Sequence, residues 1–178
     1  NNGQSLCAVN DLFVGLRTHG SARYRIRIGD AVEDHSSSGV IVSTGLGSTG
    51  WLQSLLGGAT AISRSAQAAF YGLSMAVGAE TTAREPAPLA QSEARARWQF
   101  PSDADYLYFT VREPFPSRRT GCALAFGRIT TDTSFSIESQ MPENGVIFSD
   151  GIEHDYIEFN SGARAAIGLA SRKGVLVV

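Results

Sequence analysis

Lysine and cysteine are nearly absent from this chain, and each shortage excludes a class of chemistry. Lys173 is the single lysine, against fourteen arginines. A P-loop and a pyridoxal-phosphate site both need a lysine at a defined place inside the fold, so neither is expected. The two cysteines, Cys7 and Cys122, are too few for a disulfide framework and too isolated for a zinc site. We therefore expect a reducing, cytoplasmic location and no metal site.

The sequence also lacks long apolar runs and a large excess of charge of either sign. No apolar run approaches the ~20 residues that span a bilayer, and the formal net charge is −2. We therefore expect neither a membrane nor a nucleic acid as partner. Acidic residues are absent from His35 through Ala79, where Arg64 is the only formal charge. That segment is expected either to be buried or to line a site for an anionic ligand.

The overall composition is that of a globular protein. The chain has 178 residues, of which 43% are hydrophobic and 18% charged, which predicts one domain over residues 1–178. Nineteen glycines indicate many turns. The sequence begins Asn-Asn-Gly without a Met, and it is therefore expected to be a piece of a longer protein.

The first third of the chain predicts strands followed by a helix. Arg23, Arg25 and Arg27 alternate with apolar residues, the period-two pattern of a strand with one wet face. Residues 39–45 form an almost continuous apolar run, typical of a buried central strand. Apolar residues then recur at helical spacing from Trp51, and this helix is expected to end at Gly57 and Gly58. Residues 81–97 are expected to form an exposed connection.

From Arg97 onward the sequence predicts strands alone. Short apolar runs are separated by Gly, Pro, Asn and Asp, which is the pattern of a sandwich or barrel. The predicted strands fall in residues 97–100, 105–115, 121–129, 133–139, 145–151, 155–161, 163–170 and 174–178. The fold class is therefore mainly β, with one or two helices inserted between residues 48 and 75.

Three glycines, Gly45, Gly47 and Gly50, form G-x-G-x-x-G between the buried strand and the helix. A dinucleotide fingerprint of the Rossmann type also needs an acidic residue about 20 positions on, and the sequence has none there. The turn either offers amides and hydroxyls to polar or anionic groups or is a tight turn without a ligand. Ser48 lacks the nucleophile-elbow pattern because Leu46 replaces its first glycine.

Polar residues at strand ends leave both structural and functional interpretations open. Asn10 and Asp11 interrupt an apolar strand, where they either pair across the sheet or recognise a ligand. Asp150 and Gly151 follow an apolar strand and read as a hairpin turn. Arg112 at the end of another strand is either a clamp for a phosphate or a salt bridge at the rim.

The segment Ser37 to Trp51 resembles the substrate-binding signature of NAD kinases. That signature reads Asp-Gly, a hydrophobic strand, then Ser-Thr-Pro-x-Gly-Ser-Thr-Ala-Tyr and a short helix ending in Gly-Gly. Matches to it are Ser43, Thr44, Gly47, Ser48 and Thr49, with Gly50 and Trp51 in place of Ala-Tyr, and then Ser54, Gly57 and Gly58. Ser38 stands for the aspartate and Gly45 for the proline.

Further landmarks follow the same order along the chain. Asn10 and Asp11 resemble the family's Asn-Glu pair, Arg112 with Pro114 its Arg-Pro element, and Asp150 with Gly151 its late Asp-Gly. The combination is closest to the divergent mitochondrial-type NAD kinases and their bacterial relatives. The Gly-Gly-Asp-Gly motif of the family's catalytic N-terminal domain is absent from the sequence.

The resemblance implies the C-terminal β-sandwich of an ATP-dependent NAD kinase-like protein, which makes NADP by phosphorylating the adenosine ribose 2′-hydroxyl of NAD(H). NAD is then the substrate, ATP and Mg²⁺ bind through the missing N-terminal domain, and the chain alone is inactive but self-associates. The implied substrate-binding residues are Asn10, Asp11, Gly47, Ser48, Thr49, Gly50, Trp51, Ser54 and Asp150; no catalytic residue is implied. A non-catalytic nucleotide-binding or assembly domain, or a kinase for a lipid or sugar acceptor, stays open because of Ser38 and Gly45.

Overall fold

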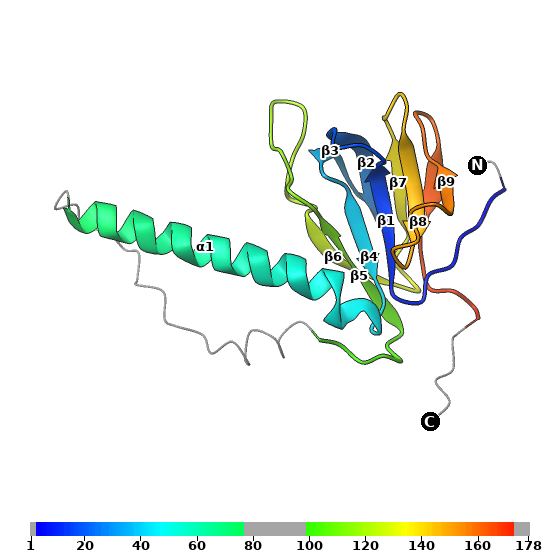
Figure 1. Ribbon diagram of the computed structural model, residues 1–178, viewed down its shortest axis with the longest axis horizontal. Helices are drawn as coiled ribbons and strands as arrows, with labels where there is room; N and C mark the ends of the chain where they lie inside the picture. Colours follow the sequence, from blue (N-terminus) through cyan, green and yellow to red (C-terminus); the bar gives the residue numbers. More distant parts are fainter. Residues whose placement is uncertain (1–2, 77–98, 173–178) are drawn as a thin grey trace.

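Two antiparallel sheets packed against each other form the body of the protein. The computed structural model describes the backbone of residues 3–76 and 99–172 (Figure 1). The six-stranded sheet has the order β6-β5-β4-β1-β8-β9, and the four-stranded sheet has the order β10-β7-β2-β3. The strands of the larger sheet, in chain order, are β1 (Asp11–Leu16), β4 (Val40–Ser43), β5 (Tyr106–Val111), β6 (Phe126–Thr130), β8 (Gly145–Ser149) and β9 (Tyr156–Glu158). Those of the smaller sheet are β2 (Ala22–Ile28), β3 (Ala31–Ser37), β7 (Phe135–Ser139) and β10 (Arg164–Ala166).

The core lies between the two sheets and is filled by one face of each strand. In β2, Ala22, Tyr24 and Ile26 are fully buried, while the arginines between them face outward. In β5, Leu107 and Phe109 likewise face the core. The period-two alternation predicted for residues 22–28 is therefore confirmed, and so is the mainly β sandwich.

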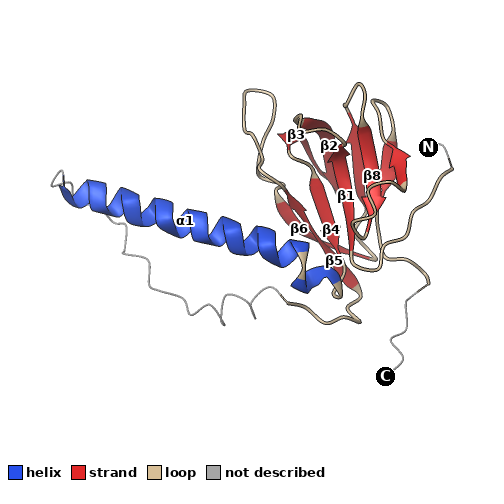
Figure 2. Ribbon diagram, in the orientation of Figure 1, coloured by secondary structure: helices blue, strands red, loops and turns tan. Residues whose placement is uncertain are grey.

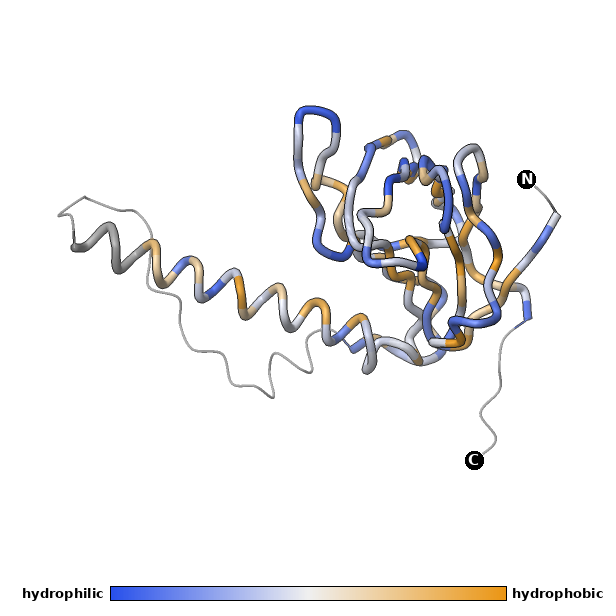
Figure 3. Tube along the Cα trace, turned by 45° about the horizontal axis from the view of Figure 1, so that its top comes forward, coloured by the Kyte–Doolittle hydropathy of each residue, from blue (hydrophilic) through white to orange (hydrophobic). Residues whose placement is uncertain are grey.

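The helical insertion differs from the expected one in length. A 3-10 turn, η1 (Gly47–Thr49), leads into one helix, α1 (Trp51–Ala76), which runs through Gly57 and Gly58. The prediction that the helix ends at this glycine pair was wrong. Each glycine costs about 1 kcal/mol relative to alanine inside a helix, and the alanine-rich segment after them favours continuation. Figure 2 shows α1 leaving the body of the sandwich, and in Figure 3 hydrophobic and hydrophilic residues alternate along the part of α1 that is coloured.

Some strand predictions need correction. Residues 99–100 are not a strand, and of residues 163–170 only Arg164–Ala166 is. Residues 31–37, which the sequence left without an assignment, form β3, because all seven residues pair with β2. The predictions for 81–97 and 174–178 lie outside the described residues.

None of the helices in the described ranges has the length and apolar character that a membrane crossing requires.

Candidate functional site

The side chain of Asp150 ties the end of β8 to the start of β1. Its carboxylate accepts hydrogen bonds from the backbone N–H groups of Val9 (3.0 Å), Asn10 (2.6 Å) and Asp11 (3.2 Å). The backbone N–H of Asp150 donates in return to the Asp11 carbonyl at 2.9 Å. Asp150 and Gly151 both have a positive φ, of 53° and 74°, as the tight turn between β8 and β9 requires. The structure thus brings Asp150 beside Asn10 and Asp11.

The glycine turn after β4 is fastened to the same place. The Thr44 hydroxyl donates to the Val9 carbonyl at 2.7 Å, and the Thr44 N–H donates to the Asn10 carbonyl at 2.9 Å. Gly47 lies so close that a Cβ there would collide with the Asn10 carbonyl oxygen and stand 2.7 Å from Asp11 Oδ1. Only a residue without a side chain permits this approach, so Gly47 brings the glycine turn and the Asn10–Asp11 segment together.

The departure from the family pattern at Gly45 has a structural reason. A Cβ at this position would collide with the carbonyl group of Pro101. A proline, which carries a Cβ, therefore does not fit here, although it occupies this place in the signature that the segment resembles. The turn keeps its form through other bonds: the buried Ser48 hydroxyl donates to the Gly45 carbonyl at 2.6 Å, and the Gly50 N–H donates to Gly47 at 2.9 Å.

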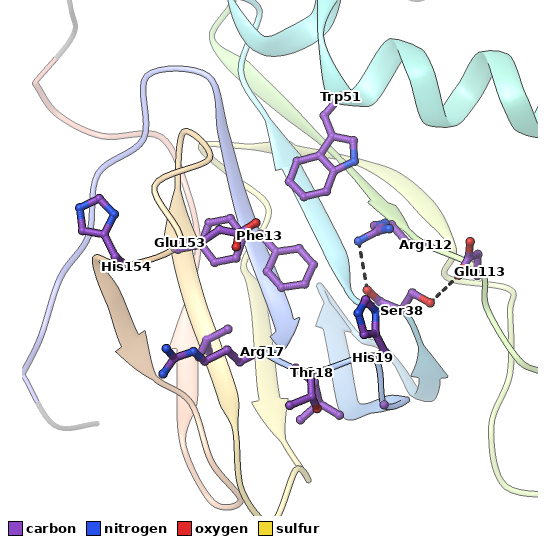
Figure 4. A pocket seen from close by; sticks show the side chains of 14 residues that line it. Phe13, Arg17, Thr18, His19, Ser38, Trp51, Arg112, Glu113, Glu153 and His154 are labelled. Atoms are coloured by element: carbon purple, nitrogen blue, oxygen red, sulfur yellow. Dashed lines mark hydrogen bonds between the residues drawn. The ribbon is translucent and has the colours of Figure 1, made fainter.

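The remaining candidates of the turn lie at its surface. Thr49 and Gly50 are exposed. Ser54 is exposed in the first turn of α1, where its N–H donates to the Gly50 carbonyl at 3.1 Å. Trp51 is half-buried and points toward the outer face of the six-stranded sheet (Figure 4).

Asp11 carries a buried acceptor without a partner. Its Oδ1 has no hydrogen bond in the structure, although the oxygen is shielded from solvent. Burial raises the pKa of the Asp11 carboxyl above its usual value; the neighbouring Ser43 hydroxyl acts in the opposite direction, and the Asp150 charge adds to the rise. Buried polar atoms in native proteins are nearly always paired, so this acceptor without a partner is an exception that needs an explanation.

Next to this cluster lies a cavity of about 800 Å³ on the outer face of the six-stranded sheet. Phe13 forms its floor, stacked on Trp51 with ring centroids 5.8 Å apart and on Phe148 at 4.8 Å. Figure 4 places Arg112, Ser38 and His19 on one side of Phe13, and Arg17, Glu153 and His154 on the other. This volume is within the range of small-molecule sites.

Most residues of the cavity were not predicted from the sequence. Trp51 was predicted, and Arg112 was expected to be either a phosphate clamp or a salt bridge; the structure gives Arg112 no salt bridge among the described residues. Phe13 and Phe148 were read as ordinary strand residues. No sequence signal distinguishes them, because β1 and β8 are apolar on both faces and only sheet pairing shows which face a residue occupies.

Comparisons with known proteins identify a similar fold but no relative by sequence. No family model matches the sequence, and no curated protein does. Among solved structures, the chain is similar to the crystal structure of an NAD kinase from Archaeoglobus fulgidus in complex with ATP, with a TM-score of 0.52. The chain has an NAD kinase-like fold. The likeness covers 92% of this chain and 46% of that one, at 13% sequence identity. It therefore supports the architecture of an NAD kinase-like domain and leaves activity to be argued from the site.

Proposed function

We propose that this chain is the NAD(H)-binding part of an ATP-dependent kinase that phosphorylates the 2′-hydroxyl of the adenosine ribose of NAD. The observation that carries the proposal is the orphan Asp11 Oδ1 beside the glycine turn, in a domain of NAD kinase-like fold. Ribose hydroxyls and the adenine amino group are hydrogen-bond donors of the kind that this oxygen lacks. Asn10 adds an exposed amide that both donates and accepts.

The task of such a domain is to hold the substrate. Phosphoryl transfer is catalysed mainly by alignment and charge stabilisation, so a ribose hydroxyl must be held in line with a phosphate. In this proposal Asn10 and Asp11 bind the nucleoside, the turn from Gly47 to Gly50 contacts it through backbone and hydroxyl groups, and Trp51 packs beside a ring. Asp150 acts through the backbone that it anchors. No catalytic residue is assigned to this chain.

Ser38 stands where the family signature has an aspartate, and the structure places another carboxylate next to it. The Ser38 hydroxyl donates to the carboxylate of Glu113, which follows β5. A carboxylate thus remains within one hydrogen bond of the position where the family signature has aspartate.

ATP and Mg²⁺ belong, in this proposal, to a domain with the Gly-Gly-Asp-Gly motif. Among the described residues, no three His, Cys, Asp or Glu side chains gather in a way that could hold a metal ion, so we assign no metal-dependent step to this chain. Self-association and a cytoplasmic location stay predictions.

Calorimetric titration with NAD tests the proposal. We expect the chain to bind NAD and the Asp11→Ala variant to bind it at least about tenfold more weakly, because a ligand donor loses its acceptor. Asn10→Ala should also weaken binding. Asp132→Ala, which removes an exposed acid in the turn between β6 and β7, is the matched control. Unchanged affinity in Asp11→Ala would contradict the assignment.

The kinase part of the proposal needs a second assay. A protein that joins this chain to a Gly-Gly-Asp-Gly domain is expected to convert NAD to NADP with ATP, whereas the 178 residues alone are expected to have no turnover. NAD binding without conversion by the joined protein would favour the non-catalytic nucleotide-binding domain. NADP formation by the chain alone would contradict the division of labour.

A further inference from the structure

The helix α1 carries an unbroken heptad pattern of apolar residues. When its sequence is written in heptads abcdefg with Leu52 at a, every a and d position is apolar, and the hydroxyl, amide and guanidinium side chains fall at other positions. The a and d residues are Leu52, Leu55, Ala59, Ile62, Ala66, Ala69, Leu73 and Ala76. Steps of three and four residues in strict alternation have a period of 3.5, which is typical of a helix that packs along another helix.

Only the start of this apolar stripe is covered by the sandwich. Leu52 is fully buried, and Leu55 packs against the apolar cluster around Phe13. Beyond Gly58, α1 runs away from the two sheets (Figure 2). There the described residues leave the stripe uncovered, since its side chains are all exposed at Ala59, Ile62, Ala66 and Ala69.

A helix that is exposed in this way gains little stability from its own sequence. Isolated helices of this length are marginal in water even when they are rich in alanine, and Gly57 and Gly58 lower the stability further. The exposed part also carries large apolar side chains, because Ile62 is 73% and Phe70 62% exposed. Most helices in proteins are stabilised by packing of one face, so we expect α1 to pack on a further element beyond Gly58.

The heptad period and the charges of α1 indicate what that element is. A period of 3.5 favours another helix, and α1 is the one α-helix among the described residues. The helix has no acidic residue, and Arg64, its one charged residue, is at position f, opposite the a and d stripe. Two copies of α1 can therefore pair without bringing like charges together, whereas a charged helix would bury charges that find no opposite charge in the stripe.

The area of such a contact predicts a weak pair. From Gly57 to Ala76 the helix is about 30 Å long. A strip roughly 15 Å wide on each of two helices would bury about 900 Å² in all, against about 1,200–2,000 Å² for a stable interface. Small residues at g, namely Gly58, Ser65 and Gly72, and the alanines of the stripe let two helix axes approach to about 8 Å, the short end of the usual range.

We propose that α1 of one copy packs along α1 of a second copy through the exposed stripe, as an antiparallel, two-fold symmetric pair. Each copy presents the same face to the other, as a two-fold interface requires. Because the sandwich holds the first turn of α1, the antiparallel arrangement keeps the two sandwiches at opposite ends of the helix pair. The inference does not depend on the proposed NAD kinase function.

The test is sedimentation equilibrium of the 178-residue chain from about 10 μM to about 1 mM. Wild type should dimerise reversibly with a Kd of roughly 10–100 μM. Ala66→Glu, at position a, should weaken the dimer at least about tenfold, because both copies would bury a carboxylate in the contact. Ala68→Glu is the matched control: it is the same change at an exposed alanine two positions along, at position c outside the stripe, and it should dimerise like wild type.

Circular dichroism and NAD titration separate the dimer from other effects. The helical signal should rise with concentration in wild type and in Ala68→Glu but not in Ala66→Glu. A wild-type chain that is monomeric at about 1 mM overturns the proposal whether or not any variant folds. Equal dimer affinity in Ala66→Glu and Ala68→Glu overturns it as well, since the contact would then lie elsewhere. Ala66→Glu should keep the wild-type affinity for NAD, so a failure of NAD to bind would remove the proposed function alone.

Discussion

The outer faces of the two sheets carry different rows of side chains, one charged and the other apolar and aromatic. Across the four-stranded sheet, Asp34, Arg25, Glu138 and Arg164 lie opposite one another on β3, β2, β7 and β10, so that negative and positive charges alternate. Arg25 Nε is 2.7 Å from Asp34, and Arg164 is 3.0 Å from Glu138. Every charge in this row has an oppositely charged neighbour, which is the arrangement of a face built for water.

A corresponding row on the six-stranded sheet is apolar and aromatic. Ile41, Phe13, Phe148 and Tyr156 lie opposite one another on β4, β1, β8 and β9. The polar groups beside it, Asp11 Oδ1 and Arg112 Nε, are buried without a partner. Buried atoms without a hydrogen bond occur on the four-stranded sheet as well, at Arg27 Nε and at both ring nitrogens of His35, so the six-stranded sheet is set apart by the aromatic row beside its unpaired groups.

Phe13→Ala should break the aromatic row and have the largest effect. Phe13 is only 6% exposed and packs on Trp51 and Phe148, so truncation should destabilise the protein by about 3 kcal/mol. Urea denaturation measures the loss. Phe13→Leu, which keeps most of the apolar volume, should cost about 1 kcal/mol. Equal losses in the two variants would mean that the packing of the row is not specific.

Removing one carboxylate from each sheet tests the same comparison. Asp150→Ala leaves the N–H groups of three residues without a charged acceptor, and it should destabilise the protein by about 2 kcal/mol. Asp34→Ala also removes several bonds, those from Arg25 and Gln140, yet these are partly exposed. Its effect on the denaturation midpoint should be much smaller. A larger loss in Asp34→Ala would reverse the comparison.

The acid sensitivity of the four-stranded sheet should come from its buried histidine rather than from its outward charges. His35 is 1% exposed, and burial lowers its pKa below 6.5, although Glu33 and Asp34 act in the opposite direction. The unfolded chain then binds more protons than the folded one as the pH falls below about 6.5, so stability should decrease. His35→Gln should flatten this slope between pH 7.5 and 5.5 in urea denaturation. An unchanged slope would assign it to other groups.

Much of the fold was predictable because its signals are local. The alternation in residues 22–28 and the short strands after residue 105 depend on side-chain period, which a sheet imposes on each strand separately. The end of α1 was not predictable in this way, because Gly57 and Gly58 face open space and their cost is spread over a long helix. β3 was missed because its apolar character is weak, and its pairing with β2 decides its structure.

The candidate site, like the fold, was predictable from the sequence only in part. The order of Asn10–Asp11, the glycine turn and Asp150 along the chain could be read from the sequence, and it came with a resemblance to a known signature. That these segments meet depends on β1 lying between β4 and β8, and on a gap at Gly47 that only a glycine fits.

The sequence by itself determined most of the strands and the turn residues they need, because strand period and glycine conformation are properties of short segments. Only the tertiary structure decided which polar groups stay unpaired. Asp11 and Arg112 are ordinary charged residues in the sequence, with many acids and bases available as partners. Their isolation follows from the register of a six-stranded sheet, which places Ser43 beside Asp11 and leaves Glu113 on Ser38 instead of Arg112.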